Sequence, residues 1–489
     1  MNGFQRAAHP MNRLTVPPRP FVVDLDGTLL RSDLLFESAM AFVRSNPWHC
    51  LKPLVWLCRG KAFLKEQLAE ATDIDVTLLP FDPEVLAMIE EQRKQGRIIV
   101  LATASHHLLA MRIAEHLKVF DDVLATSLEC NLSGTHKRDL LVALYGESGF
   151  DYVGNALDDL PIWRSAERAY VVNPLPGVGL AIESLDNVVE VVRSGATNFR
   201  DWYKAIRIHQ WAKNALIFVP LLAAHQISNP LLLLHSLLAF VFFGLCASGV
   251  YVLNDLLDLE DDRRHPSKRN RPFASGRLSI KSGLVAFPCL LFISFAGAWW
   301  WLPRQFAAVL ATYYVLTLIY SLVLKRIMAL DVIALALLYT LRIIAGGAAL
   351  ELELTVWMLA FSMFMFLSLA LVKRYAELQA ALRNGITGKT GGRDYYPADL
   401  AMLSSLGAAS GYLSVMVLAL YIHDNATIAL YAFPRMIWFA CPLLLFWITR
   451  IWMLTHRGRM NDDPVIFALR DRLSLAMGAM FGLIFWLAA

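Results

Sequence analysis

The sequence predicts an α/β Rossmann-like domain with a small helical cap, followed by an all-α polytopic membrane bundle of about nine transmembrane helices. Three observations support this fold class. Hydrophobic residues make up 57% of the 489 residues, and the mean hydropathy of +0.47 exceeds that of an average soluble protein. These residues are unevenly spread, because long apolar runs dominate only after about residue 205. The polar, proline-rich N-terminus lacks the apolar stretch of a secretory signal, so we expect the first domain to stay in the cytosol.

Nine segments are apolar over about the 20 residues that a membrane-spanning helix requires. They lie at roughly 204–226, 231–254, 281–302, 304–324, 331–350, 355–372, 400–422, 433–454 and 473–489. The first is the weakest, because Gln210, Lys213 and Asn214 lie in its opening turns. Lys and Arg concentrate in the loops after the second, fourth, sixth and eighth segments, which the positive-inside rule places in the cytosol. We therefore expect a multi-pass protein of the bacterial inner (cytoplasmic) membrane, with its N-terminal domain cytosolic and its C-terminus on the opposite side.

The composition also limits the kinds of partner. We predict a disordered tail at 1–19, the α/β domain at 20–190, a linker at 191–203 and the membrane domain at 204–489. A net charge of only +4 gives no sign of nucleic-acid binding. The six cysteines are scattered without metal-ligand spacing, which argues against a disulfide framework. The sequence leaves a homo-oligomer open.

The loop after the second predicted span carries carboxylates at helical spacing, followed by a basic run. The polar residues are Asn254, Asp255, Asp258 and Asp262, followed by Lys268 and Arg271. On a helix the three aspartates share one face, where they would repel one another unless a cation lay between them. Mg²⁺ takes oxygen ligands from a few carboxylates and leaves room for phosphate oxygens, and the basic residues can contact phosphate directly. A solvated charge run beside the membrane is the alternative reading.

This loop resembles the NDxxDxxxD signature of the UbiA-type prenyltransferase superfamily, and the resemblance covers most of residues 204–489. It implies a nine-helix bundle that binds a diphosphate through Mg²⁺ at two aspartate-rich motifs. The second motif departs from the family pattern, because the loop after the sixth span has Lys373 and Arg374 and no matching DxxxD. More cations imply more anionic groups on the substrate without more metal.

Several separate stretches resemble the branch of this superfamily that transfers 5-phosphoribose from phosphoribosyl diphosphate to polyprenyl (decaprenyl) phosphate. These stretches are residues 207–214, 265–272, 320–325 and 331–347. The resemblance implies that Asp255 and Asp258 are catalytic and that polar or cationic groups hold the phosphates of both substrates. Those groups are Lys213, Asn214, Asn254, Lys268, Arg271, Lys325, Arg342, Lys373, Arg374, Arg393 and Tyr395. Arg342 lies in mid-span, where an ionisable residue is functional by default, although a structural pairing with Asp331 or another acid is the alternative.

The N-terminal domain contains a second candidate site. Phe21–Val23 predicts a short buried strand that leads into Asp24 and Asp26, at the mouth of a parallel sheet, where α/β proteins bind ligands. The pair resembles the DxDGT signature of the haloacid-dehalogenase (HAD) phosphatases, which implies that Asp24 is the nucleophile and Asp26 the acid/base. The same resemblance assigns Thr103 to the phosphoryl group and Lys137 to the developing charge. Residues from about 33 to 80 have a helical pattern and predict the cap.

One position of this second site departs from the family pattern. Asn155 stands where the family has an aspartate that binds Mg²⁺, although an amide oxygen can still coordinate and Asp158 or Asp159 can compensate. The predicted Mg²⁺ ligands are Asp24, Asp26, Asn155 and Asp159 in the first domain, and Asp255, Asp258 and Asp262 beside the membrane domain. An inactive, regulatory or structural HAD domain is the alternative.

These observations predict a bifunctional membrane enzyme. The membrane half is expected to form a 5-phosphoribosyl lipid, and the HAD half to remove its 5-phosphate and leave polyprenyl-phosphoryl ribose for cell-envelope pentose donors. One alternative is a prenyltransferase that joins a polyprenyl diphosphate to an aromatic acceptor, and the missing second DxxxD counts against it. Another is a membrane scaffold or transporter with a regulatory HAD domain, although transporters usually bind near the midplane rather than on one side.

Overall fold

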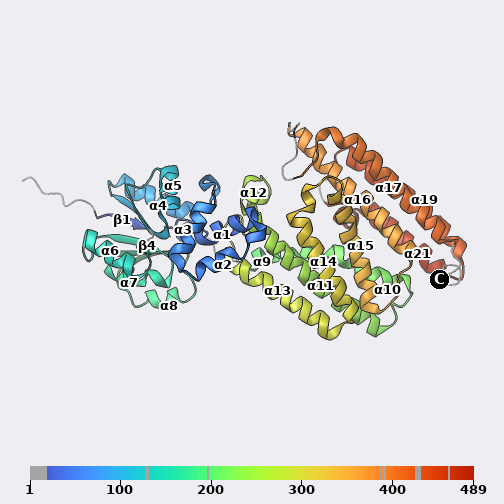
Figure 1. Ribbon diagram of the computed structural model, residues 1–489, viewed down its shortest axis with the longest axis horizontal. Helices are drawn as coiled ribbons and strands as arrows, with labels where there is room; N and C mark the ends of the chain where they lie inside the picture. Colours follow the sequence, from blue (N-terminus) through green and yellow to red (C-terminus); the bar gives the residue numbers. More distant parts are fainter. Residues whose placement is uncertain are drawn as a thin grey trace, which may run out of the picture. The chain divides into compact units, whose positions relative to one another are not determined.

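The computed structural model describes residues 19–126, 131–194, 198–385, 388, 393–423, 431–460 and 463–488 (Figure 1). The chain divides into two compact units. The first comprises Met1–Asp201 and Asp255–Ser282, and the second comprises Trp202–Asn254 and Gly283–Ala489. The aspartate-bearing loop therefore belongs to the same unit as the N-terminal domain. Most of the predicted disordered tail, and residues 195–197 of the predicted linker, lie outside the described residues.

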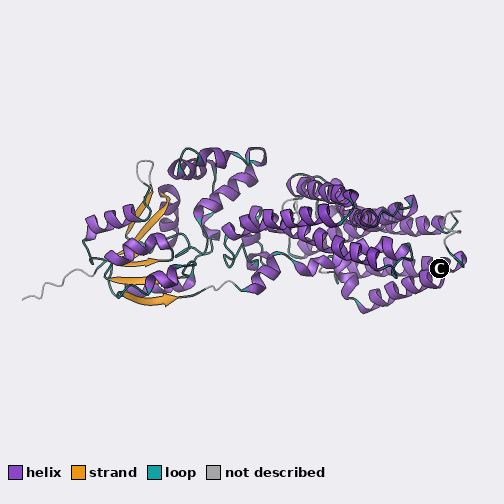
Figure 2. Cartoon of the chain, turned by 90° about the horizontal axis from the view of Figure 1, so that it is seen from below, coloured by secondary structure: helices purple, strands orange, loops and turns teal. Residues whose placement is uncertain are grey.

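The first unit is built on a six-stranded sheet of order β3-β2-β1-β4-β5-β6, in which neighbouring strands are parallel (Figure 2). The strands are β1 (Phe21–Val23), β2 (Ile99–His106), β3 (Asp122–Thr126), β4 (Asp151–Gly154), β5 (Arg168–Val172) and β6 (Val188–Val192). The chain moves outward from β1 to one edge and then returns to build the other half from β4. The strand order reverses between β1 and β4, and ligands of such sheets bind beyond the carboxyl ends of the strands at this point.

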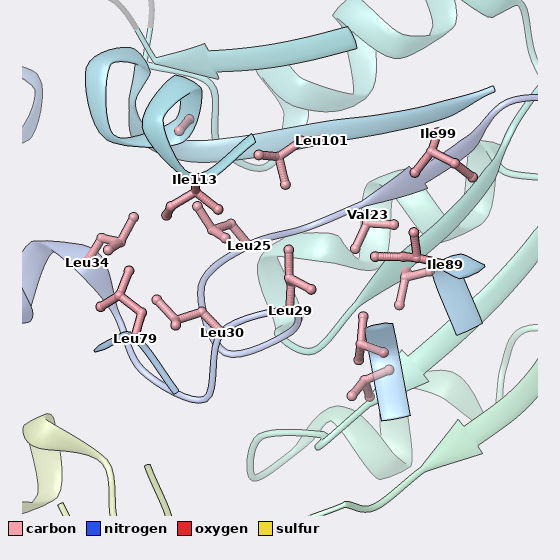
Figure 3. Packing of buried hydrophobic residues seen from close by; sticks show 14 of the residues in the cluster. Val23, Leu25, Leu29, Leu30, Leu34, Leu79, Ile89, Ile99, Leu101 and Ile113 are labelled. Atoms are coloured by element: carbon pink, nitrogen blue, oxygen red, sulfur yellow. The ribbon is translucent and has the colours of Figure 1, made fainter. Parts of the chain in front are cut away.

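Alternating apolar residues of β1 hold helices against both faces of the sheet. Phe21 and Val23 pack into one buried cluster, shown in part in Figure 3, and Val22 packs into a second cluster that contains Trp163. All three β1 residues are fully buried, as expected for a central parallel strand with both faces covered. The covering helices are α4 (Pro83–Lys94), α5 (His107–Leu117), α6 (Thr135–Tyr145), α7 (Leu160–Ser165) and α8 (Val178–Ile182). The predicted α/β domain is confirmed.

Short helices between β1 and α4 form the predicted cap. They are α1 (Leu34–Ser45), η1 (Pro47–His49), α2 (Lys52–Leu57), α3 (Lys61–Ala71) and η2 (Val76–Leu78). The Asp33 side chain caps α1 by accepting a hydrogen bond from the Leu35 amide at 3.0 Å. A small apolar cluster of Phe42, Leu64 and Leu68 joins α1 to α3. The later segment of this unit adds α12 (Leu259–Arg264) and η5 (Lys268–Asn270).

The second unit is a helical bundle. Its long helices are α11 (Pro230–Leu257), α13 (Ile280–Trp301), α14 (Arg304–Leu322), α15 (Leu330–Leu350), α16 (Val356–Arg383), α17 (Leu400–Tyr421), α19 (Ala440–His456) and α21 (Arg472–Ala488), the last of which follows α20 (Pro464–Arg470) at a bend of 85°. Within the described ranges, seven spans are long and apolar enough to cross a membrane, or eight if the bent pair is one span. This number is roughly consistent with the predicted nine.

The weakest predicted span, 204–226, is not one continuous helix. It contains the end of α9 (Phe199–Ala205), then η4 (Ile208–Phe218) and α10 (Val219–Ala223). Arg207 interrupts the helical path with a φ of +53°, and Lys213 and Asn214 are buried inside the bundle. A Cβ at Gly346 of α15 would lie 2.1 Å from the Ile217 carbonyl oxygen, so the absence of a side chain lets η4 pack directly against α15.

Candidate functional sites

The first candidate site lies at the carboxyl ends of β1, β2 and β4. Asp24 follows β1 directly, Thr103 and Ser105 lie in β2, and Asn155 follows β4. Gly27 turns the chain after Asp24 with a φ of +76°, and a Cβ there would lie 2.2 Å from the Asn155 amide nitrogen. Glycine is therefore required both for the backbone conformation and for the close approach of Asn155.

Asp24 is held by a lysine inside the domain. The Lys137 ammonium donates to Asp24 Oδ1 at 2.7 Å and to the Tyr152 hydroxyl at 3.1 Å, and the Thr28 hydroxyl lies 3.4 Å from Asp24 Oδ2. Burial raises the pKa of Asp24 to about 6, although Lys137 opposes this shift. Burial would lower the pKa of Lys137, but the charges of Asp24 and Asp159 raise it above its ordinary value. The lysine therefore stays charged beside the predicted nucleophile.

Asp26 has different partners from Asp24. Its Oδ1 accepts a hydrogen bond from the Leu34 amide at 2.8 Å, and its Oδ2 accepts one from the Ser105 hydroxyl at 2.6 Å. Burial, together with the charge of Asp33, raises the pKa of Asp26 to about 7. A carboxyl group that titrates near neutral pH is suited to general acid/base chemistry. Asp24 and Asp26, which lie in the segment that follows β1, also form a donor set that fits a hard divalent cation.

Asp159 supports the site from behind. Its Oδ2 accepts hydrogen bonds from the amides of Asn155 and Ala156, each at 3.0 Å, and its Oδ1 accepts one from the Tyr152 hydroxyl at 2.8 Å. These bonds occupy three of the roughly four acceptor positions of a carboxylate. They favour a positioning role for Asp159 over the predicted metal-ligand role, and they fix the loop that presents Asn155.

Two residues of this site were missed by the sequence reasoning. Ser105 contacts Asp26, and its own amide donates to the Thr103 hydroxyl oxygen at 2.9 Å; its place two residues after Thr103 on a strand was the available signal. Lys65 extends from α3 of the cap, and its ammonium donates to the Ala104 carbonyl oxygen at 2.5 Å. The sequence gave no comparable signal for Lys65, because the cap contact spans 39 residues.

The second candidate site is the aspartate-bearing loop. The single helix assumed for its carboxylates is broken, since α11 ends at Leu257 and Asp258 is the N-cap of α12. The break nevertheless brings two of the aspartates to one guanidinium group. Arg271 Nη1 lies 3.1 Å from Asp255 Oδ1 and 2.6 Å from Asp262 Oδ2. Burial raises the pKa of Asp262, although Arg271 opposes the shift.

This arrangement fits a divalent cation. Asp255 and Asp262 are each 2% exposed, and they already converge on one positive group. Within the part of the chain that the structure describes, no three His, Cys, Asp or Glu side chains are gathered closely enough to hold a metal alone. Mg²⁺ commonly binds through one or two carboxylates and completes its shell with water and substrate phosphate oxygens, so a carboxylate pair is sufficient.

The other face of α12 contacts the cap. Arg263 donates to both carboxylate oxygens of Glu37 on α1, at 2.6 and 3.1 Å, and to the Ala274 carbonyl oxygen at 2.8 Å. The Arg263 and Glu37 side chains are 8% and 5% exposed. Arg44 at the end of α1 pairs with Asp261. One six-residue helix therefore bears a predicted metal ligand, Asp262, between two residues that hold it against the cap.

The bundle contains a buried polar cluster around Asp463. Asp463 Oδ2 lies 2.7 Å from Lys213 Nζ and 3.3 Å from Lys373 Nζ. The Tyr339 hydroxyl donates to the same carboxylate at 3.0 Å. The structure thus brings two predicted phosphate-binding lysines, 160 residues apart in sequence, to one carboxylate.

Arg342 lies beside this cluster with neutral partners. It donates to Asn214 Oδ1 at 3.0 Å and to the Tyr313 hydroxyl at 3.2 Å, and its guanidinium lies 5.3 Å from the centre of the Phe243 ring. Its hydrogen bonds among the described residues go to side chains and carbonyls without charge. The pairing of Arg342 with Asp331, which the sequence left as an alternative, is not among these contacts.

Asp331 instead has Arg374 as its ionic partner. The two side chains approach to 2.7 Å, and the Tyr395 hydroxyl donates to Asp331 at 2.5 Å. Glu377 pairs with Arg374 and accepts from Arg393 at 2.5 Å. Three predicted substrate-binding residues therefore contact carboxylates in this structure. Of the remaining predictions, Asn254 lies in α11, Lys268 in η5 and Lys325 in η6 (Leu324–Arg326).

Comparison with known proteins assigns both halves. The model of the UbiA prenyltransferase family matches residues 215–486, which is more than half of the chain. The chain belongs to the UbiA prenyltransferase family. The model of the haloacid dehalogenase-like hydrolases matches residues 21–143, so a HAD-like domain precedes the UbiA region. Together with the apolar helices, the family indicates a multi-pass membrane protein.

Individual relatives extend this assignment. The uncharacterized protein y4nM of Sinorhizobium fredii is 36% identical over 96% of this chain and 91% of its own length. The decaprenyl-phosphate phosphoribosyltransferase of Mycobacterium tuberculosis is 33% identical over 55% of this chain and 88% of its own length. A UbiA homolog from Archaeoglobus fulgidus, solved with DMAPP and Mg²⁺, is 15% identical with a TM-score of 0.45 and covers 58% of this chain and 98% of its own.

Proposed function

We propose that the UbiA region transfers 5-phosphoribose from phosphoribosyl diphosphate to a polyprenyl phosphate such as decaprenyl phosphate, and that the HAD domain then removes the 5-phosphate. The observation that carries the first step is the 33% identity to a decaprenyl-phosphate phosphoribosyltransferase across 88% of that protein. The pair of buried carboxylates, Asp255 and Asp262, supports it, because they already bind a cationic group.

In the transfer step, an oxygen of the lipid phosphate forms a bond to C1 of the ribose while the C1–O bond to the diphosphate breaks. Asp255 and Asp262 would hold Mg²⁺, which neutralises the departing diphosphate when it is bound, and Asp258 at the break between α11 and α12 stays a predicted ligand. Arg271 is close enough to the same carboxylates to contact that diphosphate. The lipid phosphate is already anionic, so the step needs no general base, and the protein contributes positioning and charge neutralisation.

The lysines at Asp463 are a separate candidate group for binding phosphate. Lys213 and Lys373 lie against one carboxylate inside the bundle, where desolvated cations bind phosphate more strongly than they do in water. A phosphate that displaces Asp463 would take over both ammonium groups. Three other phosphate-binding predictions, Arg374, Arg393 and Tyr395, act in this proposal by fixing Asp331 and Glu377 near the ends of helices.

In the phosphatase step, Asp24 attacks the phosphorus, and the bond from phosphorus to the ribose O5 breaks. Asp26 gives its proton to that oxygen and then takes one from the water that hydrolyses the aspartyl phosphate. Lys137 neutralises charge on the phosphoryl group. Asp24, Asp26 and Asn155 would hold Mg²⁺, which supplies further positive charge to the phosphoryl oxygens when bound.

Mass spectrometry of the lipid product tests both steps together. The full chain in lipid nanodiscs, given Mg²⁺, phosphoribosyl diphosphate and polyprenyl phosphate, is expected to yield polyprenyl-phosphoryl ribose. Asp24→Asn should instead accumulate the 5-phosphorylated lipid, and Asp255→Asn should form neither product. Exposed Asp186→Asn and Glu353→Gln are matched controls for the two sites and should leave the products unchanged.

Each alternative predicts a different result in this assay. A prenyltransferase with an aromatic acceptor forms no sugar lipid, so release of diphosphate without a ribosylated lipid would exclude the proposed transfer. A scaffold or transporter leaves both substrates intact. If Asp24→Asn yields the same dephosphorylated lipid as the unchanged chain, then the HAD domain does not perform the second step.

A further inference from the structure

The outer surface of the cap carries an exposed apolar patch. It consists of Trp48, Leu51, Leu54, Val55 and Leu57, which we call the cap patch. Trp48 is 90% exposed and Leu51 is 67% exposed. Exposed apolar side chains are normal when scattered singly, but a contiguous group marks an interaction surface. The cap patch lies within ten consecutive residues, 48–57.

The cap patch extends over η1 and α2, and its residues Leu54, Val55 and Leu57 lie on α2. Trp56, on the same helix α2, points inward, and its ring lies 5.1 Å from that of Phe42. Phe42 packs in turn with Leu64 and Leu68. The inward face is therefore filled by the cap's own core, so the outward apolar residues serve no packing inside the described domain.

Basic residues surround the cap patch. Between Glu37 and Glu66 the sequence has five Lys or Arg residues and no Asp or Glu. Of these, Lys52, Arg59 and Lys61 are exposed next to the patch. Tryptophan and leucine on one side, with lysine and arginine at the rim, are typical of elements that lie in the interface of an anionic bilayer. A protein partner would need an acidic rim of its own, whereas an anionic bilayer presents negative charge over its whole surface.

The cap is also tethered to the membrane by the chain itself. The segment that joins α11 to α13 connects two helices that are apolar enough to span a bilayer. Two ion pairs fix this segment to the cap helix α1, from Arg263 to Glu37 and from Arg44 to Asp261. A third joins Lys281, at the start of α13, to Asp33 at 3.0 Å. Trp48 lies four residues beyond Arg44, so these ion pairs hold the cap patch near the segment that joins the two apolar helices.

We propose that the cap patch inserts into the interface of the same anionic membrane that contains the UbiA helices. A different helix of the cap contacts the phosphatase site, because Lys65 of α3 reaches the strand that bears Thr103 and Ser105. The inserted cap holds the HAD site at the depth of lipid head groups. A phosphate on a lipid-linked sugar is then hydrolysed without leaving the bilayer, which deepens the proposed phosphatase function and rests on it.

Spin labelling tests insertion without relying on enzymatic activity. Cys50 lies within the patch and is exposed, so a variant with the other five cysteines replaced by alanine carries one label there. The full chain in nanodiscs of phosphatidylglycerol and phosphatidylcholine is compared with the chain in detergent. We expect higher collision rates with oxygen than with a nickel chelate in the nanodiscs only. A label at Leu180→Cys, which is 78% exposed on α8, is the control and should favour the nickel chelate in both.

Equal accessibility of Cys50 and of the control in nanodiscs would overturn the proposal. If the cysteine replacement does not fold, the same comparison is made in the unchanged chain by the rate at which a membrane-impermeant maleimide reacts with Cys50, measured by peptide mass spectrometry. Protection of Cys50 in nanodiscs supports insertion, and reaction as fast as in detergent contradicts it. Protection that persists in uncharged nanodiscs and depends on protein concentration would indicate a second copy as the occupant, and would overturn the lipid assignment.

A lipid substrate and a soluble substrate distinguish loss of membrane insertion by the cap patch from damage to the phosphatase site. In Trp48→Ser/Leu51→Ser, we expect the apparent KM for the 5-phosphorylated lipid to rise, while hydrolysis of p-nitrophenyl phosphate is unchanged. Lys52→Gln should raise that apparent KM about fivefold in anionic nanodiscs and have no effect in uncharged ones. Equal losses on both substrates would contradict the proposal. If the unchanged chain hydrolyses neither substrate, the phosphatase function fails, and the spin-label result still decides whether the cap inserts.

Discussion

Asn155 stands in the N-terminal site where an aspartate would add a third carboxylate to Asp24 and Asp26. Its backbone is fixed by Asp159, and its amide group lies against Gly27. The position is therefore built to present a side chain at the site, whichever residue occupies it. An amide in place of a carboxylate lowers the negative charge among groups that are buried and whose pKa values burial has raised.

Replacing Asn155 by aspartate is expected to tighten Mg²⁺ binding about tenfold, because ligand charge governs the affinity of such sites. The same change should lower the melting temperature in EDTA, since a third buried carboxylate then has no cation beside it. Both effects are read from the melting temperature of the purified chain across a Mg²⁺ titration. The exposed Asp186→Asn serves as the control, and an unaltered Mg²⁺ response in Asn155→Asp would show that this side chain does not bind the metal.

Gly27 and Gly96 are a matched pair for measuring how much stability is lost when a side chain is added at a glycine. Their φ values are +76° and +75°, but a Cβ at Gly27 meets Asn155 at 2.2 Å, whereas a Cβ at Gly96 meets nothing within 4 Å. Gly96→Ala should lose about 1 kcal/mol of stability through its backbone alone. Gly27→Ala should lose more and should also abolish phosphate release. Equal melting temperatures for the two variants would contradict the close approach of Asn155.

At the scale of elements, α12 couples the aspartate-bearing loop to the cap. Arg263 and Glu37 form a buried ion pair, and Asp262 is adjacent in the chain to Arg263. The placement of a predicted Mg²⁺ ligand for one reaction therefore depends on a carboxylate in the domain proposed for the other reaction.

Glu37→Gln should destabilise the first unit by roughly 3 kcal/mol, because it leaves the Arg263 guanidinium buried without its counter-charge. We also expect a higher Mg²⁺ requirement for formation of the ribosyl lipid, since α12 is then held less firmly. Glu70→Gln, on the exposed side of the cap helix α3, is the control. A drop in melting temperature with an unchanged Mg²⁺ dependence would mean that Glu37 supports the fold and does not position Asp262.

The sequence was informative wherever a site is built from neighbouring residues. Asp24 and Asp26 lie two residues apart after a strand. The fold places them beyond the carboxyl end of β1, where the pattern predicted them. The partners of Lys213 could not be predicted in this way, because Asp463 lies 250 residues further along the chain. The charges of Arg374 and Arg393 looked available for phosphate, because Asp331 lies 43 residues before Arg374 and Glu377 lies 16 residues before Arg393. The i,i+3 spacing of Arg374 and Glu377 on α16 was the signal that the sequence offered.

At the scale of the whole chain, the boundary between the compact units does not follow the order of the sequence. The segment Asp255–Ser282 is inserted between membrane helices, yet it packs with the N-terminal domain. The composition could predict the apolar spans and the α/β pattern, because both depend on local periodicity. It could not predict this docking, which depends on pairs such as Glu37 with Arg263 that are 226 residues apart.

The two parts should therefore remain associated after the linker is cut. Residues 1–197 and 198–489, produced together as separate chains, are expected to purify as one complex. Glu37→Arg should dissociate the pieces, because it places like charges at Arg263, and adding Arg263→Glu should restore them. Affinity purification through a tag on the first piece measures the result, and Glu70→Arg is the control. Pieces that fold but never co-purify would contradict the docking.

The distance between Glu37 and Arg263 along the chain also sets an order for biosynthesis. A ribosome adding about 5–20 residues per second makes Glu37 roughly 11–45 seconds before Arg263. During that interval the α/β sheet can already be complete, while the cap surface around Glu37 still faces water. Only after α11 has entered the membrane does the segment that covers this surface leave the ribosome. Insertion of α11 and completion of the N-terminal fold are thus successive stages of one maturation event.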